Sequence, residues 1–307
     1  LLRHSMANLK ELKTRISSVK STQKITSAMK MVAASRLKRA QEAAEAARPY
    51  AERMERMIAS VMESQQSIQS APKLLAGNSS DETYLFVIIT SDRGLCGGFN
   101  SSIVREVRNR IRDLLSAGKT VKFLCVGRKG RDQLKSEFAA SIIKTYEGIG
   151  RSGVKFSEAE DLASDLIEMF EADEFDICTV VYNNFVSVIT QVVTSQQIIP
   201  VDLVGLEQVS EEDEGLSTKE KPSAIYEYEP SEQEILTELL PSNLKIQVFR
   251  ALLESSASEH GARMSAMDNA TRNAGEMIDD LTLTFNRSRQ AKITSELIEI
   301  ISGAEAL

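Results

Sequence analysis

The sequence predicts an α/β protein in which two long terminal helices pair as an antiparallel coiled coil and are joined by a βαβ domain. Three observations predict this fold. Each end of the chain carries a heptad-type apolar repeat, and strand-length apolar runs alternate with helical segments in the middle. Aromatic residues make up only 5% of the chain, and tryptophan is absent. The expected division is 1–70 and 236–307 for the coil helices and 71–235 for the domain.

The N-terminal helix is expected over about 8–67, where steps of three and four residues from Leu9 trace an apolar seam. Thirteen of its sixteen positions are apolar. The exceptions are Gln23, Thr26 and Lys30. The apolar residues beside them are Ile25, Met29 and Val32. This shift of phase predicts that the seam rotates around the helix. Pro49 is expected to kink the helix without ending it, because the repeat resumes at Met54.

The C-terminal helix shows the same repeat from Met264 to Phe285, after which the apolar stripe shifts phase. The shifted positions are Ile293, Leu297 and Ile300. Pro241, followed by two polar residues, predicts the start of this helix, and we expect it to run to about Ser302. Each terminal helix would be on the order of 60 residues, or roughly 90 Å, long. Because a compact domain joins them, antiparallel pairing is expected.

The middle of the chain alternates between apolar runs and helical segments, which predicts a βαβ sheet covered on both faces. The expected strands are Tyr84–Thr90, Thr120–Val126, Ser141–Tyr146 and Phe175–Tyr182, and the expected helices are Asn100–Ser116, Arg128–Phe138 and Ser157–Phe170. The β-rich run Val186–Ile199 is expected to add an antiparallel strand. Pro72–Asp81 is predicted to be a polar linker, and the acidic stretch 209–223 a mobile loop.

The charge distribution indicates an acidic partner near the N-terminus. The net charge is −7, yet the segment from Lys10 to Arg39 holds nine basic residues and one acid, Glu11. This run could also bind nucleic-acid phosphates or form a solvated face. No aromatic residues interleave with it and the chain as a whole is acidic, so we expect no nucleic-acid partner.

The loop Ser91–Asn100 lies between a strand and a helix, where α/β proteins hold phosphates. Its glycines, Gly94, Gly97 and Gly98, match neither the dinucleotide nor the P-loop spacing, so we expect a tight turn instead. Cys96 could be a nucleophile at a helix start, but a small buried cysteine is favoured. Three dispersed cysteines and two histidines predict no disulfide, metal site or cofactor.

No run of about 18 apolar residues is present, so membrane association is expected to depend on a partner. Leu1–Ser5 precede Met6, which we expect to be the natural start. These five residues would then be an added remnant or the stub of a cleaved targeting segment.

Four blocks, in chain order, resemble the gamma subunits of F-type ATP synthases and span nearly the whole chain. They are Arg15–Ala34, Ser91–Gly98 (SDRGLCGG), Ser258–Ala270 and Leu281–Ala304, the last containing LTLTFNRSRQ and ITSELIEIISGA. The resemblance implies a Rossmann-like αβ domain at the foot of the coiled coil. It implies a non-catalytic rotor shaft that couples proton-driven rotation of the c-ring to conformational cycling of the catalytic β subunits. A non-rotary coiled-coil interaction protein is the alternative.

The resemblance also implies partners: the α and β subunits of an α3β3 hexamer, the epsilon subunit and the c-ring. The chain would be peripheral to the membrane through Fo, on the cytoplasmic face of a bacterial inner membrane or, alternatively, the matrix side of a mitochondrial one. Met29 and Lys30 match positions that face the β-subunit lever loop, and Arg289 and Gln290 match a pair that hydrogen-bonds another β-subunit loop. The positions that match the foot segment near the c-ring are Tyr226, Tyr228 and Glu229.

Overall fold

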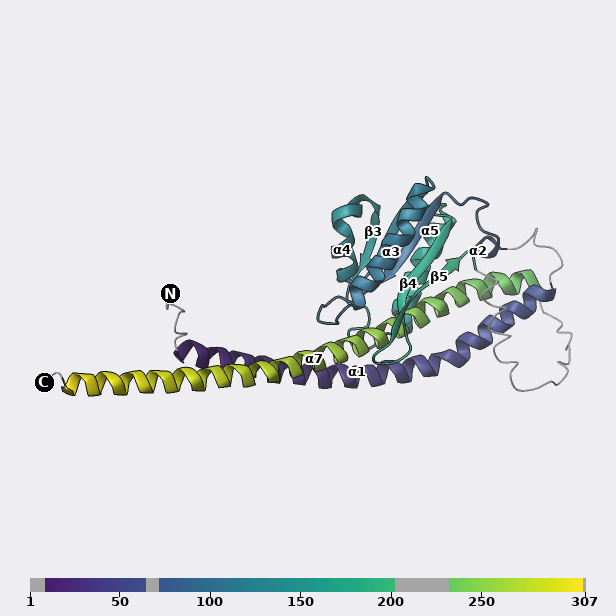
Figure 1. Cartoon of the computed structure of the whole chain (residues 1–307). Coiled ribbons are helices and arrows are strands. Elements are labelled where there is room, and N and C mark those ends of the chain that lie inside the picture. Colours follow the sequence, from purple (N-terminus) through teal and green to yellow (C-terminus); the bar gives the residue numbers. More distant parts are fainter. Residues whose placement is uncertain (1–8, 65–71, 202–231, 306–307) are drawn as a thin grey trace, which may run out of the picture. The chain divides into compact units, whose positions relative to one another are not determined.

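The computed structural model describes residues 9–64, 72–201 and 232–305 of the 307-residue chain. Helix α1 (Leu9–Ser64) has 56 residues, and helix α7 (Glu232–Glu305) has 74. A five-stranded sheet with its own helices lies between them in the sequence (Figure 1). The predicted fold class, a long helix at each end with an αβ domain in the middle, is confirmed. The acidic stretch 209–223 lies outside the described residues.

The sheet has the order β3-β2-β1-β4-β5, in which the first four strands run parallel and β5 runs antiparallel to β4. The strands are β1 (Thr83–Ile89), β2 (Thr120–Val126), β3 (Ile142–Tyr146), β4 (Ile177–Phe185) and β5 (Gln191–Ile199). The other helices are α2 (Lys73–Ala76), α3 (Phe99–Ser116), α4 (Arg128–Phe138), the 3₁₀ turn η2 (Ala139–Ser141) and α5 (Phe156–Glu171). Each predicted strand and helix of the domain is present within two residues of its expected ends, with two exceptions. Strand β4 ends three residues later than predicted, at Phe185, and residues 186–190 form the turn before β5.

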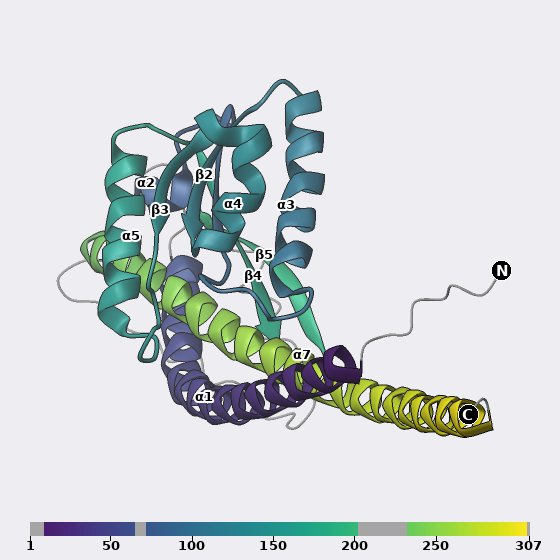
Figure 2. The same ribbon diagram turned by 90° about the vertical axis from the view of Figure 1, so that its left-hand side faces the viewer.

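Two apolar cores lie on opposite faces of the sheet, as expected for strands that are buried on both sides. Along β1, Phe86 and Ile88 point into a core shared with α3 and α4. The alternate residues Leu85 and Val87 point into a second core, shared with α5 and with Leu244 and its neighbours on α7. Figure 2 shows α5 and the pair α3 and α4 on the two sides of the strands.

The chain divides into two compact units, and the division falls inside both long helices. We call residues 1–33 with 263–307 the coil unit, and residues 34–262 the sheet unit. Within the described part of the chain, no helix is both long enough and apolar enough to span a bilayer.

Two prolines lie inside the long helices. Pro49 does not end α1, as predicted. The predicted start of α7 was wrong, because the helix begins nine residues before Pro241. Leu236 and Leu240 account for this extension, since both are fully buried against the sheet-unit part of α1 and bury enough apolar surface to outweigh the proline. The predicted linker also contains a short helix, α2, whose Leu75 joins the same cluster.

Candidate functional site

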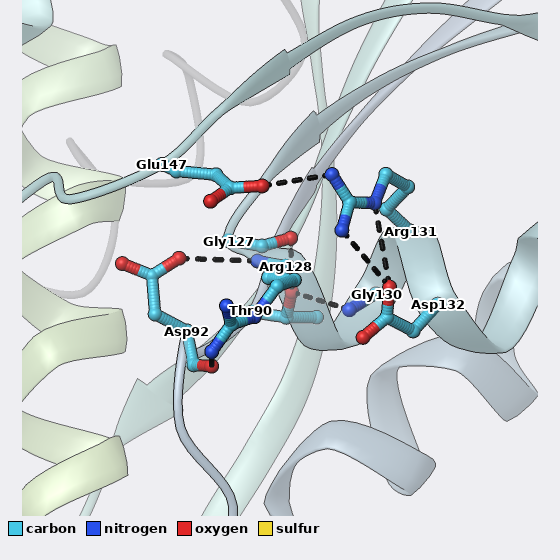
Figure 3. A network of polar contacts seen from close by, with 8 residues as sticks. All are labelled: Thr90, Asp92, Gly127, Arg128, Gly130, Arg131, Asp132 and Glu147. Carbon is cyan, nitrogen blue, oxygen red and sulfur yellow. Dashed lines mark hydrogen bonds and ion pairs between the residues drawn. The ribbon is translucent and has the colours of Figure 1, made fainter.

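The loops after β1, β2 and β3 meet at the carboxyl ends of the parallel strands, where α/β sheets bind ligands (Figure 3). Asp92 follows β1, and its carboxylate accepts hydrogen bonds from the backbone N–H groups of Arg128 (3.1 Å) and Gly148 (2.7 Å). The Arg128 N–H belongs to the first turn of α4. Asp92 therefore supplies the negative charge that an anionic ligand would bring to this helix N-terminus.

Two glycines allow α4 to begin very close to the end of β1. Gly127 has φ +92°, and a Cβ there would lie 2.1 Å from the carbonyl oxygen of Thr90. A Cβ on Gly130 would lie 2.8 Å from Thr90 Oγ1, which accepts a hydrogen bond from the Gly130 N–H at 2.9 Å. Beside them, Arg131 pairs with Asp132 and Glu147 (Figure 3). Glycine at these two positions therefore allows α4 to pack closely against the end of β1.

Hydrogen bonds between side chains and backbone of the loop Ser91–Asn100 hold its two ends together. Asn100 Oδ1 accepts a hydrogen bond from the Ser91 N–H at 2.9 Å, and Asn100 Nδ2 donates to Ser91 Oγ at 2.8 Å. Asn100 Nδ2 also lies 3.2 Å from the sulfur of Cys96, which is buried. The predictions of a tight turn and of a buried Cys96 are confirmed.

The remaining cysteines are buried in the two cores of the sheet unit. Burial raises the pKa of the Cys125 thiol to about 11 and also raises the pKa of Cys178. Both side chains are therefore protonated thiols at neutral pH and serve as small apolar residues. Among the residues that the structure describes, no group of three His, Cys, Asp or Glu side chains is placed to hold a metal ion.

In the coil unit, α1 and α7 pair antiparallel through the three polar seam positions. Lys30 Nζ lies 2.6 Å from Asp268 Oδ1, and Thr271 Oγ1 donates to Thr26 Oγ1 at 2.8 Å. Gln23 approaches Gly275, where an added Cβ would lie 3.2 Å from Gln23 Nε2. The face of α1 that contacts α7 therefore stays the same across the polar positions. Each polar side chain there has a partner on the facing helix or fits against its backbone.

The predicted rotation of the seam was consequently wrong. Ile25 and Val32 are 60% and 55% exposed, and Met31 is exposed beside them. Polar side chains face the partner helix here, and apolar side chains face outward. A coiled coil normally has the reverse arrangement. The inversion leaves an apolar stripe on α1 that the coil itself does not cover, in which Met29 is half-buried.

Arg289 and Gln290 are exposed on α7, near the place where its partner helix begins. Leu9 lies 21 residues before Lys30, and Arg289 lies 21 residues after Asp268. In an antiparallel pair, Leu9 at the start of the described α1 therefore lies opposite about residue 289. Arg289 and Gln290 thus mark the end of the two-helix coil as the structure describes it.

Beyond this point α7 continues as a helix with an apolar surface, its yellow end in Figure 1. Five apolar side chains here are 49–67% exposed: Ile293, Leu297, Ile298, Ile300 and Ile301. The sequence predicted three of them as a shifted seam, but no described residue of α1 faces them. Ile298 and Ile301 were missed because the seam pattern follows one helix face only.

Asp268 and Thr271, the polar partners across the coil, were also missed as functional candidates. The sequence did offer a signal for them, because Asp268 lies within the block Ser258–Ala270 and Thr271 directly follows it. The foot candidates Tyr226, Tyr228 and Glu229 lie outside the described residues.

The ion pair predicts a pH dependence of the coil. The hydrogen bond and charge of Lys30 hold the pKa of Asp268 below its ordinary value. A lowered pKa in the folded state adds stability above the ordinary aspartate pKa, and that stability is lost as pH falls through the lowered pKa. Asp268→Asn should therefore lower the melting temperature slightly at pH 7 and not at about pH 2.

Far-UV circular dichroism of the full chain checks this expectation, with Asp279→Asn at an exposed site on the same helix as the control. An equal difference between the variant and the wild type at both pH values would contradict the assignment of the pair to the coil.

Residues 8–307 match the model of a protein family that is described as ATP synthase. The ATP synthase gamma chain of Paramagnetospirillum magneticum is 59% identical over 302 residues, which are 98% of this chain and 100% of that protein. The gamma chain of Rhodospirillum rubrum is 58% identical with the same coverage.

Solved structures agree with this assignment. The central stalk and c-ring structure of the Tetrahymena thermophila mitochondrial ATP synthase contains a chain with 30% identity and a TM-score of 0.57, covering 80% of this chain and 99% of that one. A chain of the Euglena gracilis mitochondrial ATP synthase shares the fold, with 20% identity, a TM-score of 0.66 and coverage of 97% and 94%. Since the relatives align over their full lengths, this chain belongs to the family of ATP synthase gamma chains.

Proposed function

We infer that this chain is the rotor shaft of an ATP synthase, which couples rotation of the membrane ring to conformational cycling of the catalytic subunits. The observation that carries this function is the 59% identity to a gamma chain over the full length of that protein. The coil unit is suited to the role, because α7 extends beyond the described part of α1 with exposed apolar side chains. Such a surface is typical of a helix that another protein encloses.

The partners in this proposal are the α3β3 hexamer around the coil, with the epsilon subunit and the c-ring at the foot. The Tetrahymena relative, which belongs to a central stalk and c-ring assembly, supports the last of these. One shaft inside a threefold collar contacts each catalytic subunit differently. Its rotation therefore changes which conformation each β subunit prefers, and with it the affinity for nucleotide.

Two pairs of residues are proposed to contact β subunits. Met29 and Lys30 lie in the inverted segment of the seam, beside the exposed Ile25 and Val32. The excess of basic residues around them suits an acidic loop on the partner. Arg289 and Gln290 are exposed on α7 opposite the start of the described part of α1, so their side chains are accessible to a surrounding hexamer. Tyr226, Tyr228 and Glu229 remain the proposed c-ring contacts.

The shaft is proposed to have no catalytic site of its own. The geometry at the carboxyl ends of the strands supports this. Asp92 and Asn100 accept hydrogen bonds from the backbone N–H groups that would otherwise bind a phosphate. Calorimetry of the full chain with ATP and with NAD should give no saturable binding. Saturable binding that is lost in an Asp92 variant would instead support an enzyme.

We place the chain at the membrane as a peripheral subunit held through Fo, on the cytoplasmic face of a bacterial inner membrane. The bacterial relatives support this location over the matrix side of a mitochondrion. Fractionation of cells with and without Fo tests it, since the chain should leave the membrane fraction when Fo is absent.

Reconstitution tests the function as a whole. The full chain, mixed with an α3β3 hexamer that lacks gamma, should co-purify with it and restore ATPase activity that is coupled to proton pumping once Fo is added. A non-rotary coiled-coil protein would instead self-associate through its seam. Failure both to bind the hexamer and to restore coupling would exclude the shaft function.

Arg289→Ala should weaken coupling in the reconstituted complex without unfolding the helix. Removing an exposed arginine from a contact with a partner subunit costs about 1.5–3 kcal/mol of charged hydrogen bonding. This corresponds to a roughly 10-fold or larger weakening of the contact between the shaft and the β subunit. The measurement is the number of protons pumped per ATP, with far-UV circular dichroism as the check on folding. A large fall in helicity would mark Arg289 as structural.

A further inference from the structure

Within the sheet unit, α7 is enclosed on nearly all sides over residues 251–261. Most side chains of this stretch are buried, although half of them are not apolar. The buried members are Ala251, Leu252, Leu253, Glu254, Ser255, Ala257, Ser258 and His260. A helix that is enclosed in this way is usually apolar all round. The buried polar side chains therefore require a specific explanation.

Glu254 joins three elements of the sheet unit. Its carboxylate lies 3.2 Å from Arg48 Nη2 on α1 and accepts a hydrogen bond from the backbone N–H of Phe185 at the end of β4, at 3.3 Å. The Glu254 side chain is only 5% exposed, whereas Arg48 is half exposed. A buried carboxylate of this kind is stable only while its partners stay in place.

Ser258, one turn further along α7, makes the second polar contact to β4. Its hydroxyl donates to the backbone carbonyl of Asn183 at 2.9 Å, and both residues are buried. The Asn183 side chain in turn donates to the carbonyl of Phe99 at the start of α3, at 3.3 Å. At Gly261 the helix comes so close that an added Cβ would lie 3.1 Å from the Phe185 ring.

Residues 254, 258 and 261 occupy one face of α7, because their spacing of four and three matches the helical repeat. Apolar contacts hold a helix against a sheet but depend little on direction, so they resist turning about the helix axis only weakly. Buried hydrogen bonds are directional, and breaking one leaves an unsatisfied group at a cost of about 1–3 kcal/mol. The polar row therefore opposes rotation and sliding of α7 on β4.

We propose that Glu254 and Ser258 are positioning residues that fix α7 to β4, so that torque applied to the sheet turns the helix and the sheet does not slip past it. We call this pair, with Arg48 and Asn183, the polar joint. The proposal rests on the shaft function and adds to it the place where the load passes from domain to helix. Both residues act through α7.

The test uses the full chain in a reconstituted ATP synthase with Fo in vesicles. Glu254→Gln keeps the size of the side chain and an acceptor for Phe185 but removes the charge, and Ser258→Ala removes the hydroxyl. The matched control is Glu160→Gln. Glu160 also pairs with α7, through Lys245 at 2.8 Å, but this pair is more exposed and so contributes less.

The readout is the ratio of protons pumped to ATP hydrolysed, measured as the opposing proton gradient rises. We expect the ratio in Glu254→Gln and Ser258→Ala to fall about threefold or more under load, while ATP hydrolysis without a gradient stays within about twofold of the wild type. The control should keep the wild-type ratio. A merely structural role would reduce assembly and both activities together and leave their ratio unchanged.

A wild-type ratio under load in both variants would overturn the proposal, provided that the wild-type chain itself restores coupling. Loss of assembly in both would also overturn it, because the contacts would then be a requirement of folding. If the wild-type chain restores no coupling, the shaft function fails first, so the two failures are distinguishable.

Discussion

Gly127→Ala is expected to destabilise the sheet unit by about 3–5 kcal/mol, by combining backbone strain with overpacking. Gly127 has φ +92°, a conformation that L-residues rarely adopt. The new Cβ would lie 2.1 Å from the carbonyl oxygen of Thr90 and 2.6 Å from its carbonyl carbon. Both are backbone atoms, so no rotation of a side chain relieves the contact.

Movement of the backbone would also be costly. The Thr90 N–H donates to the carbonyl of Val126 at 2.8 Å, and the Gly127 N–H donates to the carbonyl of Tyr146 at 2.8 Å. Separating Gly127 from Thr90 therefore disturbs the ends of β1, β2 and β3 together. Unfolding by denaturant, followed by far-UV circular dichroism of the full chain, measures the loss of stability.

Gly118→Ala is the matched control, since Gly118 has φ +78° but no atom within 4 Å of an added Cβ. It should cost only about 1–2 kcal/mol, the strain of the left-handed conformation. Equal losses in the two variants would show that the close approach of α4 to β1 is not what requires glycine at 127.

Phe123→Ala is expected to cost about 3–5 kcal/mol through the cavity that it leaves. Phe123 lies on β2, is 0% exposed and is among the largest fully buried side chains of the described chain. Its ring contacts Phe86 at a centroid distance of 6.3 Å and Phe138, edge to face, at 5.6 Å. Three elements of the core therefore lose packing at once.

Phe156→Ala provides the comparison, because Phe156 also forms an edge-to-face pair, with Phe249 at 5.5 Å, but is 45% exposed. It should cost about 1 kcal/mol. In the reconstituted complex, Phe123→Ala should reduce the amount of assembled shaft. A loss of stability similar to that of Phe156→Ala would mean that the core around β2 collapses to fill the cavity.

The strands and helices of the sheet unit could be predicted from the sequence almost residue by residue, because their signals are local. The run Thr120–Val126 is both the predicted strand and β2, and Arg128–Phe138 is both the predicted helix and α4. Glycines at the turns and continuous apolar runs mark these boundaries without any knowledge of the partner elements.

The seam of the coil was predicted correctly in position but not in detail. The heptad steps pass through Gln23, Thr26 and Lys30, but these polar residues were interpreted as an interruption of the seam, whereas in the structure they face α7. The heptad pattern could not show that Lys30 meets Asp268, because the two residues lie 238 positions apart and their meeting depends on the register of the antiparallel pair. Without that partner, a lysine in the seam looked like a reason for the seam to rotate.

Periodicity and motif blocks are properties of the chain alone, so the element order, the long terminal helices and the family could all be predicted before any packing was known. The packed structure was needed to show that α7 begins before Pro241, that Asp92 accepts hydrogen bonds at the carboxyl ends of the strands, and that Glu254 is buried beside Arg48. Each of these depends on a balance between burial and polar pairing across distant segments. Such a balance exists only once the segments are packed together.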